Sequence, residues 1–227
     1  MPNNSSSFPF EAVLWDMDGT LIDSEPIWME QERRLMESIG AQWSEEDARY
    51  CLGGPMTRVD EYMRLRSGKK FLPGELTTKL LEMVGESFAD SIPFAPGAKE
   101  LLEELQSLAI PMALVSASPR KLMAQAMRSI GEGRFASVIS NDDVTSPKPN
   151  PEGYLLAAKQ LGVSIARSLI IEDSIPGMGA AQSSGAFVLG VAHFSELPEG
   201  PRTIQRISLH GLSVALLSEL FNPILAR

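Results

Sequence analysis

The chain has 227 residues, of which 44% are hydrophobic and 22% are charged, and its formal net charge is −9. These values are typical of a globular protein with a sizeable core, and they exclude a disordered chain. No run of lysine and arginine is longer than two residues, so we expect no nucleic-acid partner.

We also expect no membrane partner and a cytoplasmic location. Met1 to Phe10 lacks the basic region and the long apolar region of a signal peptide. No apolar run approaches the ~20 residues that span a bilayer. The only cysteine, Cys51, excludes an internal disulfide and a cysteine-based zinc cluster, and it fits a reducing compartment.

The first predicted element is a short buried strand, Ala12 to Trp15, which ends abruptly in Asp16-Met17-Asp18-Gly19-Thr20. From residue 24 to residue 92 the pattern predicts helices and no strand. The predicted helices of this stretch are Pro26 to Ile39, Met56 to Leu65 and Glu75 to Phe88. An all-helical segment therefore interrupts the chain after its first strand.

After Pro93, strands alternate with helices. The predicted strands are 112–115, 137–139, 168–171 and 186–191, and the predicted helices are 99–108, 119–130, 151–161, 176–184 and 212–220. This alternation predicts an α/β fold with a Rossmann-like parallel sheet and helices on both faces. We assign residues 1–23 and 93–227 to this core, and residues 24–92 to an inserted all-helical cap.

Polar residues recur where the predicted strands end. Because ligands of open parallel sheets bind beyond the carboxyl ends of the strands, we expect these side chains to meet. They are Asp16 and Asp18 after the first strand, Ser116 after the second, Lys148 in the loop after the third, and Glu172 and Asp173 after the fourth.

The side chains of this set suit a divalent cation and a phosphate group. Asp16 and Asp18 are two residues apart, so an extended backbone points both carboxylates the same way. Mg²⁺ prefers such oxygen ligands. Asp173 supplies a further ligand, and Glu172 is either a ligand or an acceptor behind the ligands. Lys148 and Ser116 would contact the phosphate, and Gly19 lets the backbone approach it.

Taken in order, these segments resemble the haloacid dehalogenase-like hydrolase superfamily, in the branch with a helical cap after the first strand. The family's four motifs match Asp16 to Thr20, Ser116 within Leu114-Val115-Ser116-Ala117-Ser118, Lys148 within Ser146-Pro147-Lys148-Pro149, and Glu172-Asp173-Ser174 with Gly177 following. The resemblance covers about residues 10 to 192.

The resemblance implies a role for each matched residue. Asp16 would attack phosphorus and form an aspartyl phosphate, and Asp18 would protonate the leaving oxygen and then activate water. The side chains of Asp16 and Asp173 and the backbone carbonyl of Asp18 would hold Mg²⁺. Asp18 also disfavours carbon–halogen cleavage, because the dehalogenases of the superfamily lack this second aspartate.

Sugar-phosphate phosphatases and β-phosphoglucomutase are the relatives that the chain most resembles. Leu21 to Pro26 looks like the phosphatase version of the cap's first segment. The mutase usually carries a histidine in the first cap helix, where this chain has Trp28, and its first histidine is His193. Gly53 to Arg58 resembles the substrate-facing loop of the cap, although a surface arginine beginning a helix explains Arg58 equally well. The residues predicted to bind substrate are Gly19, Glu25, Arg58 and Ala117.

The sequence thus predicts a Mg²⁺-dependent phosphatase, a phosphoric monoester hydrolase, that acts on a small phosphorylated metabolite such as a sugar phosphate. Two alternatives stay open: a phosphosugar mutase similar to β-phosphoglucomutase, and a non-catalytic phosphate-binding regulator. We expect a monomer, which is the default for a small capped enzyme.

Overall fold

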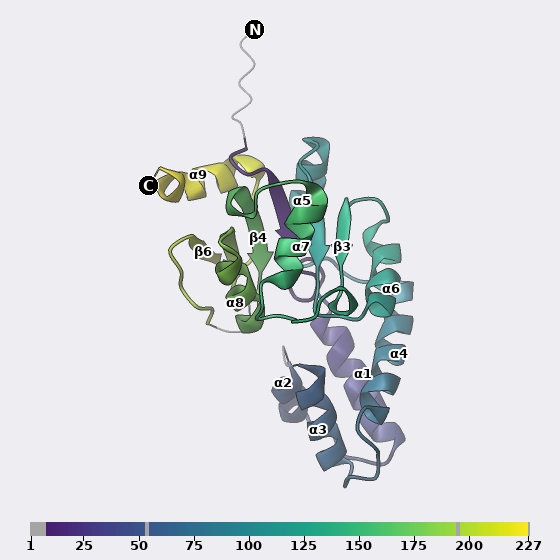
Figure 1. The fold of residues 1–227 in the computed structure, drawn as a ribbon. Helices are drawn as coiled ribbons and strands as arrows, with labels where there is room; N and C mark the ends of the chain where they lie inside the picture. The colour runs from purple at the N-terminus through teal and green to yellow at the C-terminus, as the bar shows by residue number, and fades with distance from the viewer. Residues whose placement is uncertain (1–7, 53–54, 194–195, 227) are drawn as a thin grey trace. The chain divides into compact units, whose positions relative to one another are not determined.

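The protein divides into two compact units. The computed structural model describes residues 8–52, 55–193 and 196–226. One unit comprises residues 1–23, 94–123 and 131–227, and the other comprises residues 24–93 and 124–130. The first is an α/β unit and the second is helical (Figure 1).

The α/β unit is built on a six-stranded sheet in the order β3-β2-β1-β4-β5-β6, and every neighbouring pair is parallel. Parallel strands need crossover connections, which the intervening helices supply. The predicted Rossmann-like α/β fold is confirmed. The strands are β1 (Ala12–Trp15), β2 (Met112–Val115), β3 (Ser137–Ile139), β4 (Ser168–Glu172), β5 (Phe187–Val191) and β6 (Thr203–Arg206).

The strand order reverses at β1. From β1 the chain adds β2 and β3 on one side, and then returns to add β4, β5 and β6 on the other. Trp15 is in register with Leu114 of β2 and with Ile171 of β4. The carboxyl ends of these three strands therefore lie side by side at the position where parallel sheets of this type bind ligands.

Helices cover both faces of this sheet, because successive strand residues point to opposite sides. Leu14 of β1 and Val188 of β5 belong to a buried cluster with Tyr154 and Met178. Phe187 faces the other way and packs on Phe10 and Phe221, with ring centroids 5.2 and 5.9 Å away. The helices of this unit are α5 (Ala98–Ser107), α6 (Arg120–Ile130, split between the units), α7 (Glu152–Leu161), α8 (Ile175–Ser184) and α9 (Val214–Leu225), with short 3-10 turns at Asn141–Asp143 and Ile165–Arg167.

The helical unit contains α1 (Glu25–Ser38), α2 (Glu45–Cys51), α3 (Met56–Arg66) and α4 (Glu75–Asp90). Trp28 of α1 packs edge-on against Phe88 of α4, with ring centroids 6.5 Å apart. The hydroxyl of Ser129 donates a hydrogen bond of 2.7 Å to the carbonyl of Phe88. This bond helps to explain why the second half of α6 belongs to the helical unit, which the sequence pattern does not indicate.

Two elements escape the sequence analysis, and one extends beyond its predicted end. The seven-residue helix α2 is too short for a helical period, but Ser44 and Asp47 form a reciprocal capping box at its start. Strand β6 is only partly buried at the sheet edge, so its sequence shows no clear apolar alternation. Helix α9 begins at Val214 rather than 212, because Ser213 caps it, and it continues to Leu225 rather than 220.

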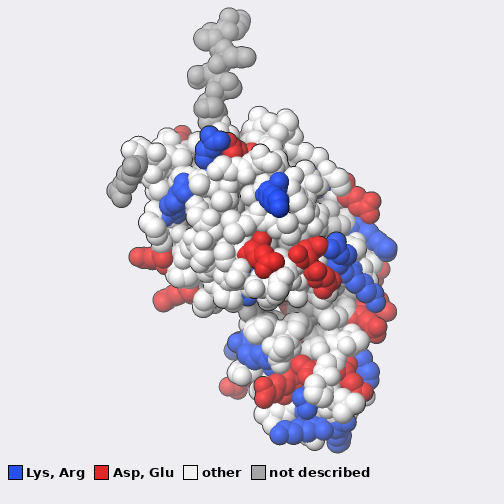
Figure 2. Space-filling view, in the orientation of Figure 1, with Lys and Arg blue, Asp and Glu red and all other residues white. Residues whose placement is uncertain are grey.

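No helix among the described residues is both long enough and apolar enough to cross a bilayer. Figure 2 shows positive and negative side chains interspersed on the face in view, with no continuous positive area among the residues drawn in colour or white.

Candidate active site

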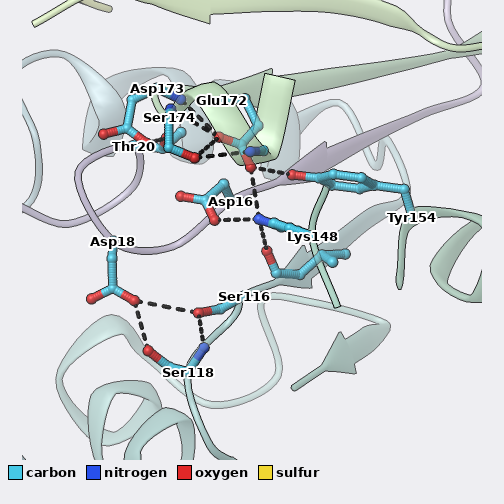
Figure 3. A network of polar contacts seen from close by, with 12 residues as sticks. Asp16, Asp18, Thr20, Ser116, Ser118, Lys148, Tyr154, Glu172, Asp173 and Ser174 are labelled. Carbon is cyan, nitrogen blue, oxygen red and sulfur yellow. Dashed lines mark hydrogen bonds and ion pairs between the residues drawn. The ribbon is translucent and has the colours of Figure 1, made fainter. Parts of the chain in front are cut away.

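The main chain places the predicted polar residues directly beyond the ends of neighbouring strands. The amide of Asp16 donates to the carbonyl of Ile171, and the amide of Ser116 donates to the carbonyl of Ile139, each at 3.0 Å. The sheet ladder thus continues by one residue past β1 and β2. Glu172 is the last residue of β4, and Asp173 follows it. The structure therefore brings these side chains together, as Figure 3 shows.

Lys148 joins two carboxylates. Its ammonium donates to Oδ1 of Asp16 at 2.6 Å, to Oε1 of Glu172 at 2.7 Å and to the carbonyl of Val115 at 3.0 Å. Burial alone would lower the pKa of Lys148, but the carboxylates of Asp16 and Glu172 reverse this effect and hold the pKa well above its usual value. Lys148 is therefore a fixed positive charge beside Asp16.

Asp16 lies in a strongly perturbed environment, with only 6% of its surface exposed. Burial raises the pKa of Asp16 to about 7, the carboxylate of Glu172 adds to the rise, and Lys148 opposes it. Burial, which disfavours the charged form, is therefore the main cause of the raised pKa of Asp16.

The carboxylate of Glu172 is completely buried and accepts hydrogen bonds on both oxygens. Oε1 accepts from Lys148 and from the hydroxyl of Tyr154, which lies 2.8 Å away. Oε2 accepts from the amide of Asp173 and from the amide and hydroxyl of Ser174, at 3.0 to 3.2 Å. These bonds fill the acceptor positions of the carboxylate. Glu172 therefore holds Lys148 and the strand end rather than offering a free oxygen.

The side chain of Asp18 is bound by two serines. Its Oδ2 accepts from the hydroxyl of Ser118 at 2.9 Å and from the hydroxyl of Ser116 at 3.3 Å. The hydroxyl of Ser116 also accepts from the amide of Ser118 at 2.9 Å, so the turn after β2 is fixed. Ala117 lies exposed between the two serines. Asp18 thus lies on the β2 side of the site, away from the Lys148 network.

Gly19 makes room for Asp173. Gly19 has a φ of +80°, which disfavours other residues, and an added Cβ would lie 2.1 Å from Oδ2 of Asp173. The hydroxyl of Thr20 donates to Oδ1 of the same carboxylate at 3.1 Å. The loop after β1 therefore positions Asp173 as well as carrying Asp16 and Asp18.

Three carboxylates of this site are close enough to share a metal ion. Asp16, Glu172 and Asp173 each have an oxygen within 4.8 Å of the others. The Asp18 side chain is not in this group. Clustered carboxylate oxygens are the ligands that Mg²⁺ prefers.

The remaining two predicted residues, Glu25 and Arg58, belong to the helical unit. Arg58 donates to the carbonyls of Tyr50 and Leu52, at 3.0 and 3.2 Å, where α2 ends. Its guanidinium also lies 5.3 Å from the centre of the Tyr50 ring. Of the loop expected to face substrate, Gly53 and Gly54 lie outside the described residues.

Sequence reasoning missed several residues of this site. Ser118 and Thr20 lie within the matched motifs. Their position in these motifs could have identified them as site residues. Tyr154 gave none, because it lies inside α7 and only the packing of that helix brings it to Glu172. Gly177 stood in the fourth motif, yet its function is visible only in three dimensions: an added Cβ would lie 1.8 Å from Oε1 of Glu172.

Known proteins are similar to this chain in sequence and in fold. The chain is 33% identical to a phosphorylated carbohydrates phosphatase of Thermotoga maritima, over 81% of this chain and 86% of that one. It is 29% identical to a validoxylamine A 7′-phosphate phosphatase of Streptomyces hygroscopicus, over 80% and 85% of the two chains. The crystal structure of a putative β-phosphoglucomutase from Thermotoga maritima superimposes with a TM-score of 0.75 at 28% identity, over 92% and 99% of the chains.

These relatives confirm the prediction of a phosphoric monoester hydrolase. The family model described as haloacid dehalogenase-like hydrolase matches residues 13–191. This range contains β1 except for its first residue, all of β2 to β5, and every labelled residue of the site in Figure 3. The chain therefore belongs to the haloacid dehalogenase-like hydrolase family.

Proposed function

We propose that this protein is a Mg²⁺-dependent phosphatase that hydrolyses a small sugar phosphate through an aspartyl phosphate on Asp16. The observation that carries the proposal is the buried contact of 2.6 Å between Asp16 and Lys148, with Asp18 held two residues further on by serine hydroxyls. A carboxylate nucleophile, a neighbouring cation and a second carboxyl group are the parts that phosphoryl transfer to an aspartate requires.

The proposed reaction has two steps. Since Oδ1 of Asp16 is engaged by Lys148, we assign the attack on phosphorus to Oδ2. The bond between phosphorus and the ester oxygen breaks, and the leaving alcohol takes a proton from Asp18. Asp18 then removes a proton from water, which attacks phosphorus and releases inorganic phosphate and the Asp16 carboxylate. Lys148 and Ser116 stabilise charge on the phosphoryl oxygens.

The acidic cluster fits Mg²⁺, which we assign to the side chains of Asp16 and Asp173 and the backbone carbonyl of Asp18. Glu172 is left out of this set because its oxygens already accept five hydrogen bonds. The closeness of the carboxylate oxygens of Asp16 and Asp173, which lie within 4.8 Å of each other, supports a resident cation. When bound, Mg²⁺ would neutralise charge on the transferring group.

A sugar phosphate is the proposed substrate class, and residues 24–92 are the proposed cap. The name of one phosphatase relative supports the first part, because it specifies phosphorylated carbohydrates as the substrate. The all-helical character of α1 to α4, between β1 and α5, supports the second. We assign Gly19 and Ala117 to binding of the transferring phosphate, and Glu25 and Arg58 to recognition of the rest of the substrate.

Phosphate release from a panel of sugar and sugar-alcohol phosphates, with Mg²⁺, tests the proposal. Asp16→Asn should abolish release, because the amide cannot form the acyl phosphate. Asp90→Asn, an exposed change at the end of α4, is the matched control and should release phosphate at the native rate. Equal release by Asp16→Asn and the native chain would exclude Asp16 as the nucleophile.

The same panel separates the two alternatives. A mutase would convert a hexose 1-phosphate to its isomer when a catalytic amount of the bisphosphate is present. The similarity to a putative β-phosphoglucomutase favours this test, whereas Trp28 in place of the mutase histidine argues for hydrolysis. A regulator would bind a phosphorylated metabolite in Mg²⁺ and release no phosphate.

We further propose that the protein is a cytoplasmic monomer. The buried position of the only cysteine, Cys51, is compatible with a reducing compartment. A monomer would give a mass of 24.7 kDa by light scattering. Fractionation of cells that express the native chain would test its location.

A further inference from the structure

Tyr154 contacts the Lys148 network in two ways. It lies in α7 and is only 1% exposed. Its hydroxyl donates a hydrogen bond of 2.8 Å to Oε1 of Glu172, the same oxygen that accepts from Lys148 at 2.7 Å. The face of its ring lies under the ammonium of Lys148, which is 5.0 Å from the ring centre. Figure 3 shows the hydroxyl of Tyr154 pointing at the Glu172 oxygen that also accepts from Lys148.

The hydroxyl of Tyr154 affects how close the Lys148 ammonium lies to each of its two carboxylate acceptors, Asp16 and Glu172. Lys148 is nearly equidistant from Asp16 and Glu172, at 2.6 and 2.7 Å. A carboxylate oxygen that already accepts a hydrogen bond is a weaker acceptor for a second donor. The hydroxyl therefore reduces the pull of Glu172 on the ammonium, which then stays close to Asp16.

Other contacts fix the Glu172 carboxylate in place. The hydrogen bond from Tyr154 therefore determines how strongly Oε1 of Glu172 attracts the Lys148 ammonium. Oε2 accepts hydrogen bonds from the amides of Asp173 and Ser174. Gly177 of α8 packs directly against the carboxylate. The carboxylate cannot turn to replace a lost donor. Removal of the Tyr154 hydroxyl would leave Lys148 as the donor to Oε1, and the ammonium would shift toward Glu172.

From these contacts we propose that Tyr154 is a positioning residue for phosphoryl transfer, which holds the Lys148 ammonium between Glu172 and Asp16. This inference rests on the proposed function, and it adds a residue outside the four matched motifs. Tyr154 does not touch the reacting atoms. It acts through Lys148, by its hydroxyl on Glu172 and by its ring beneath the ammonium.

Tyr154→Phe is the sharpest test, because it removes the hydroxyl and keeps the ring. With p-nitrophenyl phosphate as the probe, kcat should fall about 10- to 100-fold, the range expected for a lost hydrogen bond to a charged group. KM should change by less than about 3-fold, because the hydroxyl does not contact substrate. A native kcat in a folded Tyr154→Phe variant would overturn the inference.

Ser137→Ala is the matched control for a purely structural role. The Ser137 hydroxyl donates a partly buried hydrogen bond of 2.8 Å to Gln160, which also lies in α7, and among the residues that the structure describes no hydrogen bond of Ser137 joins the Lys148 network. Its loss should lower Tm as Tyr154→Phe does, while kcat stays native. If both variants lowered kcat in proportion to their loss of Tm, Tyr154 would be structural only.

A double-mutant cycle decides whether Tyr154 acts through Lys148. In a Lys148→Met background, adding Tyr154→Phe should lower the single-turnover rate by less than about 2-fold, because the partner is already absent. A second fall as large as the first would overturn the inference. If Lys148→Met does not fold, Lys148→Gln also removes the ammonium at a similar side-chain length, and the same criterion applies.

The experiment also separates the inference from the proposed function. If Asp16→Asn and the Lys148 variant both hydrolyse p-nitrophenyl phosphate at the native rate, the proposed function fails. If both lose hydrolysis while Tyr154→Phe keeps the native kcat, only the role of Tyr154 is overturned.

Discussion

At the scale of single residues, close approach between glycines and carboxylates shapes the site. Gly19 leaves room for Asp173, and Gly177 leaves room for Glu172. In both cases the carboxylate occupies the space that a Cβ would need. Two acidic side chains can therefore lie against the main chain, and the amides of Asp173 and Ser174 donate to Glu172. Amide donors stabilise the ionised form of a carboxyl group.

Gly177→Ala is predicted to disrupt the network around Lys148. The new Cβ would lie 1.8 Å from Oε1 of Glu172, so the buried carboxylate must move and Lys148 with it. We expect kcat to fall by at least about 10-fold, and the stability to fall by about 1–3 kcal/mol, the cost of leaving buried polar groups without partners. Steady-state kinetics and thermal melting would measure both.

Gly179→Ala provides the comparison for this change. It lies two residues further along α8, and its Cβ would meet Pro149 at 3.2 Å, which a small shift can relieve. Alanine is also about 1 kcal/mol better than glycine in a helix interior. This variant should therefore keep native kcat. An equal loss in both variants would mean that any added Cβ in α8 is harmful, and would remove the specific role of Gly177.

At the scale of elements, α1 buries a carboxyl group that the proposed reaction does not use. Glu32 is 4% exposed, and its Oε2 has no hydrogen-bond partner among the described residues. Burial raises the pKa of Glu32 to about 8, and the neighbouring Trp43 side chain only partly opposes this rise. Helix α1 therefore packs into the helical unit with Glu32 protonated at neutral pH.

This burial predicts a pH dependence of stability. In the unfolded chain Glu32 has its ordinary pKa near 4.5, so between about pH 4.5 and 8 the folded state holds a proton that the unfolded state has lost. The free energy of unfolding therefore falls as pH rises through this window, by up to roughly 1.4 kcal/mol per pH unit. Below the window the stabilising contribution is fully present.

Glu32→Gln should remove this slope, because the amide stays neutral. In urea unfolding experiments, the difference in free energy of unfolding between Glu32→Gln and the native chain should shift in favour of the variant from pH 5 to pH 8. Glu86→Gln changes an exposed residue of α4 and should leave the slope unchanged. A slope in Glu32→Gln as steep as the native one would show that Glu32 titrates normally.

At the scale of the whole molecule, metal binding should stabilise the α/β unit. Asp16 and Asp173 come from separate strand ends, and both must be in place in the folded chain for a cation to bind. Mg²⁺ at about 100 times its dissociation constant should add about 2.7 kcal/mol, which is a rise of roughly 5 to 10 °C in Tm for a chain of this size.

Differential scanning calorimetry with and without Mg²⁺ would measure this effect without any substrate. Asp173→Asn should lose most of the Mg²⁺-dependent shift, and Asp90→Asn should keep it. A shift of the same size in Asp173→Asn would place the cation elsewhere, and no shift in the native chain would contradict a Mg²⁺ site at this cluster.

The sequence by itself determined the local elements and the order of the chemical groups. Apolar runs ending in Asp16, Ser116 and Glu172 identified β1, β2 and β4, because a buried parallel strand needs a continuous apolar segment. The rule that parallel strands present their carboxyl ends at one edge then joined these residues with Lys148. Short or edge elements such as α2 and β6 were missed, because their sequences carry too few apolar residues to show a period.

Only the tertiary structure decided which groups touch. Lys148 bonds to Asp16 across 132 residues of sequence, and Ser118 bonds to Asp18 across 100. Tyr154 reaches Glu172 because α7 packs on the sheet with that side of the helix inward, and no local pattern encodes this contact. The physical reason is that strand ends are set by local hydrophobic pattern, whereas hydrogen-bond partners depend on how distant segments pack.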